Sequence, residues 1–210
     1  MKIYIPSKDD CVPFRLLRYI YGYKFALIGR GSIPTSRNYI LYDALKSKED
    51  VLMIDKDVVP LFELKNFIKS AEDAFSRGYE AYCGLYYLKT LMGLSAGITK
   101  ARALELGMWP ATEIVWLPAP PVEEMQVDVC GTGLLALSYQ FLKRISSGYP
   151  WFKEQLRGEQ FVGEDVSFFL EFRPKTLASR YLANHFLDHA RYLSPLGTLE
   201  VEGELHESAN

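Results

Sequence analysis

The sequence predicts an α/β fold in which a mostly parallel central sheet carries helices on both faces, within a single compact domain. Short apolar strand patterns alternate with amphipathic helix patterns through the first ninety residues, as expected of such a sheet. The run at 51–54 is apolar throughout, which is typical of strands covered on both faces. The chain has 210 residues and 49% are hydrophobic, enough for one domain with a substantial core.

The first half supplies most of this pattern. The predicted strands are 2–6, 25–28, 51–54 and 81–88, and the predicted helices are 14–23, 36–47 and 61–77. We expect Ser36 to cap the second helix, Pro60 to stop the third strand and Gly78 to end the third helix. The third helix has its apolar residues near one face.

The second half is less regular. We expect an irregular excursion or strand pair at 109–122, a strand at 126–130, a helix at 134–145, a loop at 148–161 and a helix at 164–172. The segment 199–210 is an acidic tail with few apolar residues, and we expect it to be frayed.

Composition narrows the function. The net charge is −2, which gives no electrostatic case for nucleic-acid binding. The three cysteines are far apart, so neither a zinc site nor a disulfide framework is indicated, and we expect a cytoplasmic protein. No signal peptide or transmembrane run is seen. Fourteen tyrosines and twelve phenylalanines leave peripheral membrane contact open.

Ligands of such sheets bind beyond the carboxyl ends of the strands, which selects 6–10, 29–37 and 55–57. Asp55 and Asp57 directly follow the apolar strand at 51–54. Two carboxylates at such a point suit Mg²⁺ or Mn²⁺, which can neutralise a diphosphate leaving group. A solvated turn is the equally weighted alternative.

Three further features have a structural and a functional interpretation. Glu164 and Asp165 suit the first turn of a helix, and they also suit a general base for an acceptor hydroxyl. Arg37 near a helix start suits a phosphate, or is a surface residue. His185 and His189 would share a helix face as a two-histidine site, although a lone histidine is more often structural.

The ordered set of these segments resembles GT-A-fold glycosyltransferases, most nearly the group called family 2, over residues 1–190. The resemblance rests on Ile5-Pro-Ser, Ser36-Arg-Asn, Met53-Ile-Asp-Lys-Asp-Val, Asp128-Val-Cys-Gly-Thr-Gly, Gly163-Glu-Asp-Val-Ser-Phe and His189. It implies a GT-A-like catalytic domain over 1–198, with a nucleotide-sugar-binding half at 1–100 and an acceptor half at 101–198.

The resemblance also implies roles for single residues. The donor nucleotide and sugar would contact Pro6, Ser7, Asp9, Arg37, Asp55, Gly131, Thr132 and Gly133. A Mn²⁺ or Mg²⁺ ion would be held by Asp55, Asp57 and His189, with His185 as the other candidate histidine. Asp165 would be the general base of an inverting reaction, and Glu164 would contact the acceptor.

The expected function is therefore metal-dependent transfer of a sugar from a nucleotide-diphospho-sugar donor to a glycan, lipid or protein acceptor. A nucleotidyltransferase of related fold is one alternative, and a non-catalytic nucleotide-sugar-binding protein is another. The sequence departs from the family in the position of Asp9 and Asp10 and in the lysine at 56, where a small or acidic residue is more usual.

Overall fold

A computed structural model describes residues 1–7, 12–29, 31–88, 93–110, 112–157, 160–185, 191–193 and 199–201. Its centre is an eight-stranded sheet in the order β2-β1-β3-β10-β5-β13-β4, with β8 also paired to β13. The strands are β1 (Lys2–Ser7), β2 (Phe25–Gly29), β3 (Val51–Ile54), β4 (Val58–Pro60), β5 (Ala81–Leu85), β8 (Met125–Val127), β10 (Leu134–Leu137) and β13 (Thr176–His185).

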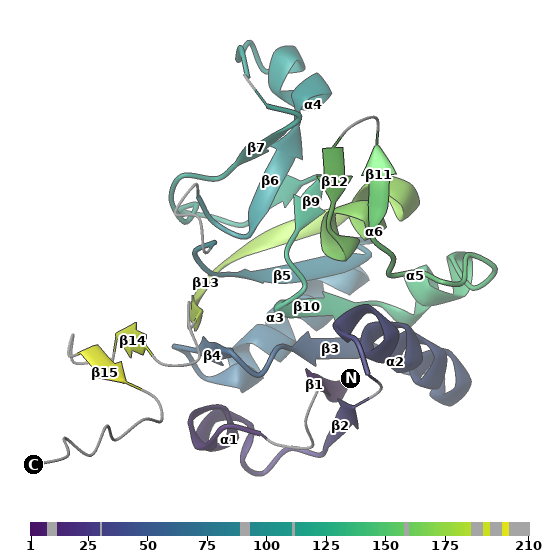
Figure 1. The fold of residues 1–210 in the computed structure, drawn as a ribbon, viewed down its shortest axis with the longest axis vertical. Coiled ribbons are helices and arrows are strands. Elements are labelled where there is room, and N and C mark those ends of the chain that lie inside the picture. The colour runs from purple at the N-terminus through teal and green to yellow at the C-terminus, as the bar shows by residue number, and fades with distance from the viewer. Residues whose placement is uncertain are drawn as a thin grey trace, which may run out of the picture.

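Five of these strands run in one direction. β1 is parallel to β2 and β3, and β13 is parallel to β5, while β10 lies antiparallel between β3 and β5. β4 and β8 are antiparallel to β13. The predicted α/β fold with a mostly parallel central sheet is confirmed (Figure 1).

Helices cover both faces, as predicted. The helices are α1 (Phe14–Ile20), α2 (Ile33–Ser47), α3 (Leu64–Ser76), α4 (Lys100–Glu105), α5 (Tyr139–Arg144) and α6 (Glu164–Phe172). Buried residues of α2, α5 and α6 form one core cluster, and buried residues of α1 and α3 form another. The four residues of β3 alternate between these two clusters, since successive side chains of a strand point to opposite faces.

Helix α3 illustrates how local sequence predicts the elements of the first half. Its buried residues Leu64, Phe67, Ala71 and Ala74 recur at spacings of three and four, which places them on one face. The chain then turns at Gly78, whose φ of +84° favours a residue without a Cβ. Local sequence therefore determines both the buried face and the end of this helix.

Smaller elements extend from the main sheet. An antiparallel sheet in the order β7-β6-β9 lies at the top of Figure 1, beneath α4. Its strands are β6 (Ala96–Thr99), β7 (Ile114–Trp116) and β9 (Val129–Cys130). Two antiparallel pairs complete the described elements, formed by β11 (Gln155–Arg157) with β12 (Gln160–Val162) and by β14 (Arg191–Leu193) with β15 (Leu199–Val201).

The predicted helix at 134–145 is wrong in its first third. Leu134–Leu137 forms β10, a central strand of the sheet, and the helix α5 begins only at Tyr139. Leucine and alanine favour helices, and a short apolar run does not by itself distinguish a buried strand from a helix. Ser138 caps α5 by accepting a hydrogen bond from the Phe141 N–H at 3.2 Å.

Two other expectations need correction. Pro60 does not stop the third strand, which already ends at Ile54; Pro60 is instead the last residue of β4, which pairs with β13. The loop expected at 148–161 carries the strand β11 and the start of β12.

The cysteines also differ from expectation. Cys83 of β5 and Cys130 of β9 form a disulfide, with their Cα atoms 6.6 Å apart. They are 47 residues apart in sequence, and only the packing of the two sheets brings them together.

No helix in the described part of the chain is long and apolar enough to span a bilayer.

Candidate active site

The polar residues of interest gather at the carboxyl edge of the parallel strands. Asp55 directly follows β3 and Tyr86 directly follows β5. Gly133 precedes β10, and because β10 is antiparallel its beginning lies at the same edge. The Asp55 N–H donates to the Gly133 carbonyl at 2.8 Å, which ties these two segments together. The edge selected from the sequence is therefore the one that assembles these groups.

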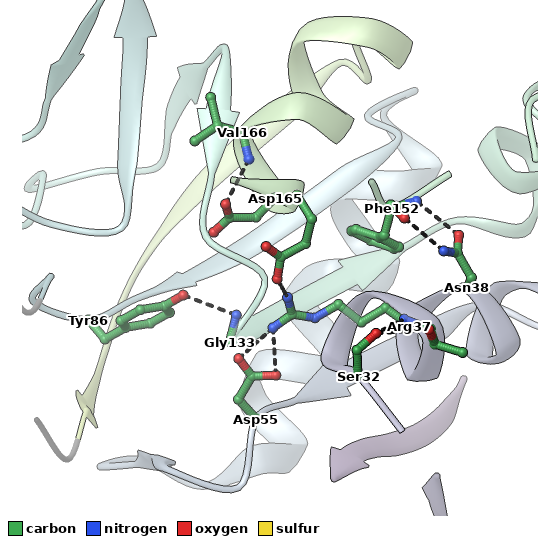
Figure 2. A network of polar contacts seen from close by, with 11 residues as sticks. Ser32, Arg37, Asn38, Asp55, Tyr86, Gly133, Phe152, Asp165 and Val166 are labelled. Atoms are coloured by element: carbon green, nitrogen blue, oxygen red, sulfur yellow. Dashed lines mark hydrogen bonds and ion pairs between the residues drawn. The ribbon is translucent and has the colours of Figure 1, made fainter. Parts of the chain in front are cut away.

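Arg37 lies at the centre of this edge (Figure 2). Its Nη2 donates to both carboxylate oxygens of Asp55 at 2.9 and 2.7 Å, and its Nη1 donates to Oε1 of Glu164 at 2.5 Å. The Arg37 side chain is only 5% exposed, against 23% for Asp55 and 19% for Glu164. One buried cation thus joins an acid that follows β3 to an acid that opens α6.

The position of Arg37 within its helix corrects the sequence interpretation. Helix α2 begins at Ile33 and its cap is Ser32, which accepts from the Thr35 N–H, so Ser36 is not the cap. Arg37 is the fifth residue of the helix and is buried, rather than lying at an exposed helix start. Its guanidinium is consequently used by protein carboxylates in this structure.

Charge and burial shift the protonation equilibria of this network. Burial raises the pKa of Asp55 above its ordinary value, although the positive charge of Arg37 opposes the shift. Burial alone would lower the pKa of Arg37, but the charges of Asp55, Glu164 and Asp165 outweigh it and raise that pKa. Arg37 therefore stays charged.

Asp165 is the second residue of α6 and faces the same group of charges. Its Oδ1 accepts from the Val166 N–H at 2.8 Å, as Figure 2 shows. Removal from water raises the pKa of Asp165, and the nearby negative charges of Glu164 and Asp55 add to the shift, while Arg37 opposes it. A carboxylate with a raised pKa is a stronger base near neutral pH than an ordinary one.

The Gly131-Thr132-Gly133 turn is packed against Tyr86. The Gly133 N–H donates to the Tyr86 hydroxyl at 3.0 Å. A Cβ on Gly131 would overlap that hydroxyl, and a Cβ on Gly133 would lie 2.8 Å from Val58 and 2.9 Å from the Tyr86 ring. Both glycines are therefore required by a close approach of backbone to side chain. Burial raises the pKa of Tyr86, which keeps its hydroxyl protonated.

Thr132, between the two glycines, has a buried side-chain hydroxyl. Its Oγ1 and the Nε of Arg37 are buried and have no hydrogen-bond partner in the part of the chain that the structure describes. A buried polar atom without a partner costs free energy, so a bound group or a water that reached it would be stabilising.

Asp57 lies beside His185 rather than beside a helical pair of histidines. His185 ends strand β13 and pairs in register with Val58 of β4, the residue after Asp57. Its Nε2 is 3.5 Å from Oδ2 of Asp57, and its Nδ1 is 3.2 Å from the Tyr87 carbonyl oxygen. The expected helix face shared by His185 and His189 is therefore wrong for His185.

These positions bear on the predicted metal site. A carboxylate oxygen and an imidazole nitrogen at this separation are both ligands that Mn²⁺ accepts. Among the described residues, no three His, Cys, Asp or Glu side chains form a metal-binding group. Asp57 and His185 would thus supply two ligands, and Asp55 is already engaged by Arg37.

The remaining predicted residues fall in two groups. Pro6 and Ser7 are the buried last residues of β1, at the same sheet edge. Asp9 and His189 lie outside the described residues. The sequence interpretation missed Tyr86, although the rule that selected Asp55 also applies to the residue after β5.

Comparison with known proteins supports the fold. No protein-family model and no curated protein matches this sequence. The crystal structure of A197 from STIV is similar to this chain with a TM-score of 0.68 and 26% sequence identity, covering 100% of this chain and 97% of A197. The likeness therefore extends over the whole length of both chains.

Two more distant structures are enzymes by their descriptions. One is a glycosyltransferase involved in the glycosylation of the major capsid of PBCV-1, with 15% identity over 84% of this chain and 80% of that one. The other is apo UDP-glucose pyrophosphorylase, with 9% identity over 89% and 74%. Both TM-scores are 0.42, too low to carry an argument about this chain. The chain is thus a mixed α/β domain with a mostly parallel central sheet, which resembles A197 throughout.

Proposed function

We propose that this chain is a glycosyltransferase that takes a sugar from a nucleotide-diphospho-sugar donor, with Asp165 as the general base. The observation that carries the proposal is the meeting of Arg37, Asp55, Glu164 and Asp165 at the carboxyl edge of the sheet. These residues come from three segments far apart in sequence. Partly buried acids gathered around one buried cation at that edge are costly to maintain, and functional sites are where such costs recur.

The roles divide between two sides of this edge. Asp57 and His185 would hold a divalent cation, which when bound supplies positive charge for the diphosphate leaving group. Asp165 accepts the proton of the acceptor hydroxyl, for which its raised pKa is suited. Arg37 donates hydrogen bonds to Asp55 and Glu164 and so holds both carboxylates in place. The role of Asp55 in donor binding is therefore a positioning role, and Asp55 is not the main metal ligand.

The glycine turn would face the donor sugar. The two glycines let the turn approach Tyr86 closely, and Thr132 offers a buried hydroxyl that has no hydrogen-bond partner among the described residues. A sugar hydroxyl that reached Thr132 would satisfy that group. This supports the role expected of Gly131, Thr132 and Gly133 without fixing the donor sugar.

The proposal is tested by donor binding and by turnover. Nucleotide-diphospho-sugars should raise the melting temperature with Mn²⁺ present, and EDTA should remove the effect, because a ligand that binds only the folded state stabilises it. Asp57→Ala and His185→Ala should lose the Mn²⁺-dependent shift. Asp73→Ala is the control, since Asp73 is an exposed acid of α3 whose ion-pair partner is Arg77, the residue after that helix.

Turnover separates this function from its alternatives. Asp165→Asn should keep donor binding and lose release of nucleoside diphosphate. Pyrophosphate release from a nucleoside triphosphate and sugar phosphate would instead identify a nucleotidyltransferase. Donor binding with no turnover towards glycan, lipid or protein acceptors would indicate a binding protein, and either result would overturn the proposal.

A further inference from the structure

A cavity of about 780 Å³ lies on the outer side of α2, between that helix and the segment after α5. Four of the nine described lining residues are aromatic, namely Tyr39, Tyr42, Tyr149 and Trp151. Tyr42 is 57% exposed and Tyr149 is 68% exposed, so both rings present much of their surface to a ligand. The volume is within the range of roughly 300–1,000 Å³ that is usual for small-molecule sites.

Part of the cavity wall is held by hydrogen bonds and a ring contact. The Trp151 indole Nε1 donates to the Ile145 carbonyl oxygen at 2.8 Å, and the Tyr149 ring packs edge-on against Trp151 with centroids 5.4 Å apart. Asn38 exchanges two hydrogen bonds with the backbone of Phe152, at 2.8 and 2.9 Å. Trp151 and Asn38 are therefore held in place before any ligand arrives, which reduces the entropic cost of binding.

The chemistry of the lining favours a neutral ligand with both apolar and hydroxyl surfaces. Lys46 is the only charged side chain among the described lining residues, so it would repel an organic cation, and a polyphosphate would find only this one counter-charge. Thr35, Ser146 and the tyrosine hydroxyls provide polar groups beside the aromatic rings. A sugar ring matches this arrangement, because its C–H faces pack on aromatic rings while its hydroxyls point to the edges.

We propose that this cavity binds sugar units of a carbohydrate chain, and that it serves as a subsite for a glycan acceptor. Arg37 and Tyr42 are five residues apart in α2, so their side chains point about 140° apart around the helix. The cavity and the candidate active site consequently lie on different sides of α2. They are connected through Trp151, which lines the cavity, and Phe152, whose ring lies 5.9 Å from the Arg37 guanidinium.

The role as an acceptor subsite rests on the function proposed above, whereas carbohydrate binding by the cavity does not. Binding should therefore be measured without nucleotide or metal. Maltotriose, cellotriose, chitotriose and mannotriose are the probes, with saturation-transfer NMR for contact and calorimetry for the dissociation constant. At least one should bind, and the Asp57→Ala variant should bind it equally well.

Matched variants locate the binding. Tyr42→Ala and Tyr149→Ala should each lower the affinity for the trisaccharide by about tenfold or more, because each removes an aromatic ring from the cavity wall. Tyr42→Phe keeps the ring and should retain most of the affinity. Tyr21→Ala removes a tyrosine that directly follows α1 and is 84% exposed, and this variant should bind the trisaccharide as the parent does.

Three outcomes would overturn the proposal. One is the absence of binding by all four trisaccharides, and another is binding that Tyr42→Ala leaves unchanged. The third is a dimer in sedimentation velocity that Tyr42→Ala dissociates, which would make this face an interface between two copies. Absence of sugar binding together with donor turnover would refute the subsite and leave the proposed transferase function standing. Sugar binding without donor turnover would refute the transferase function and leave carbohydrate binding by the cavity standing.

Discussion

Arg37 on α2 donates through one nitrogen, Nη2, to both carboxylate oxygens of Asp55 after β3, at 2.9 and 2.7 Å. The two residues are 18 positions apart in sequence, and the arginine also reaches Glu164, 127 positions away. This guanidinium consequently fixes the relative positions of α2, the end of β3 and the start of α6. Its removal tests how far the edge of the sheet depends on one cation.

Arg37→Ala should destabilise the chain by about 2 to 4 kcal/mol, because it leaves two acids without their buried counter-charge. The cost is toward the lower part of the range for fully buried pairs, since Asp55 and Glu164 keep 23% and 19% exposure. Urea unfolding measures the free energy. Arg77→Ala is the control, because its side chain is 45% exposed and its ion pairs should contribute less than about 1 kcal/mol. Equal costs for the two variants would contradict a structural role for Arg37.

Asp165→Asn should raise the melting temperature at neutral pH while it abolishes transfer. The pKa of Asp165 is higher in the folded chain than in the unfolded chain. The folded state therefore becomes less stable as the pH rises from about 4, the ordinary carboxyl range, to the raised value. Asparagine does not ionise and can still accept from the Val166 N–H, so it removes that loss. Thermal melts of both proteins between pH 4 and pH 8 measure the difference, which should be smallest at the acidic end. A variant less stable than the parent at pH 8 would show that the Asp165 charge stabilises the fold.

Gly131→Ala should be destabilising because its Cβ would overlap the Tyr86 hydroxyl, and Tyr86→Phe should rescue part of that loss. We expect the alanine to cost about 1 to 3 kcal/mol as overpacking. The rescue is partial, since a Cβ at 131 would still lie 3.0 Å from the ring carbon Cζ and 3.1 Å from Ser95, and the Gly133 N–H would lose its acceptor. A double-mutant cycle by urea unfolding measures the coupling.

The control for this cycle is Gly22→Ala. Gly22 has a φ of +87° and open space around it, so an alanine there is strained by backbone conformation alone. Its cost should add to that of Tyr86→Phe without coupling. Simple additivity of Gly131→Ala and Tyr86→Phe would mean that the turn moves away from Tyr86 instead of pressing against it.

The Cys83–Cys130 disulfide should contribute roughly 4 kcal/mol, the chain-entropy expectation for a closed loop of this length. The double variant Cys83→Ala/Cys130→Ala should therefore unfold at lower urea than the oxidised parent, and a parent kept in reductant should behave like the variant. Peptide mapping after alkylation should label both cysteines only when reductant is added first. Labelling of Cys83 in the urea-unfolded chain without reductant would contradict the bond.

The predicted strands of the first half and the helix at 164–172 are confirmed because their signals are local. Leu64, Phe67, Ala71 and Ala74 define a helix face within thirteen residues, and the apolar run at 51–54 defines a strand covered on both sides. The edge that carries the site followed from the same pattern, because parallel strands end together. The fold class and the sheet edge could thus be determined from the sequence alone.

Only the tertiary structure decided which residues meet. The antiparallel insertion of β10, the disulfide between β5 and β9, the burial of Arg37 between Asp55 and Glu164, and the placing of His185 beside Asp57 all depend on partners distant in sequence. No local pattern records such a partner, because a strand or a charged side chain has the same local sequence signal whichever segment it finally contacts. Those contacts are selected by the packing of the whole core and by the need to compensate buried charge.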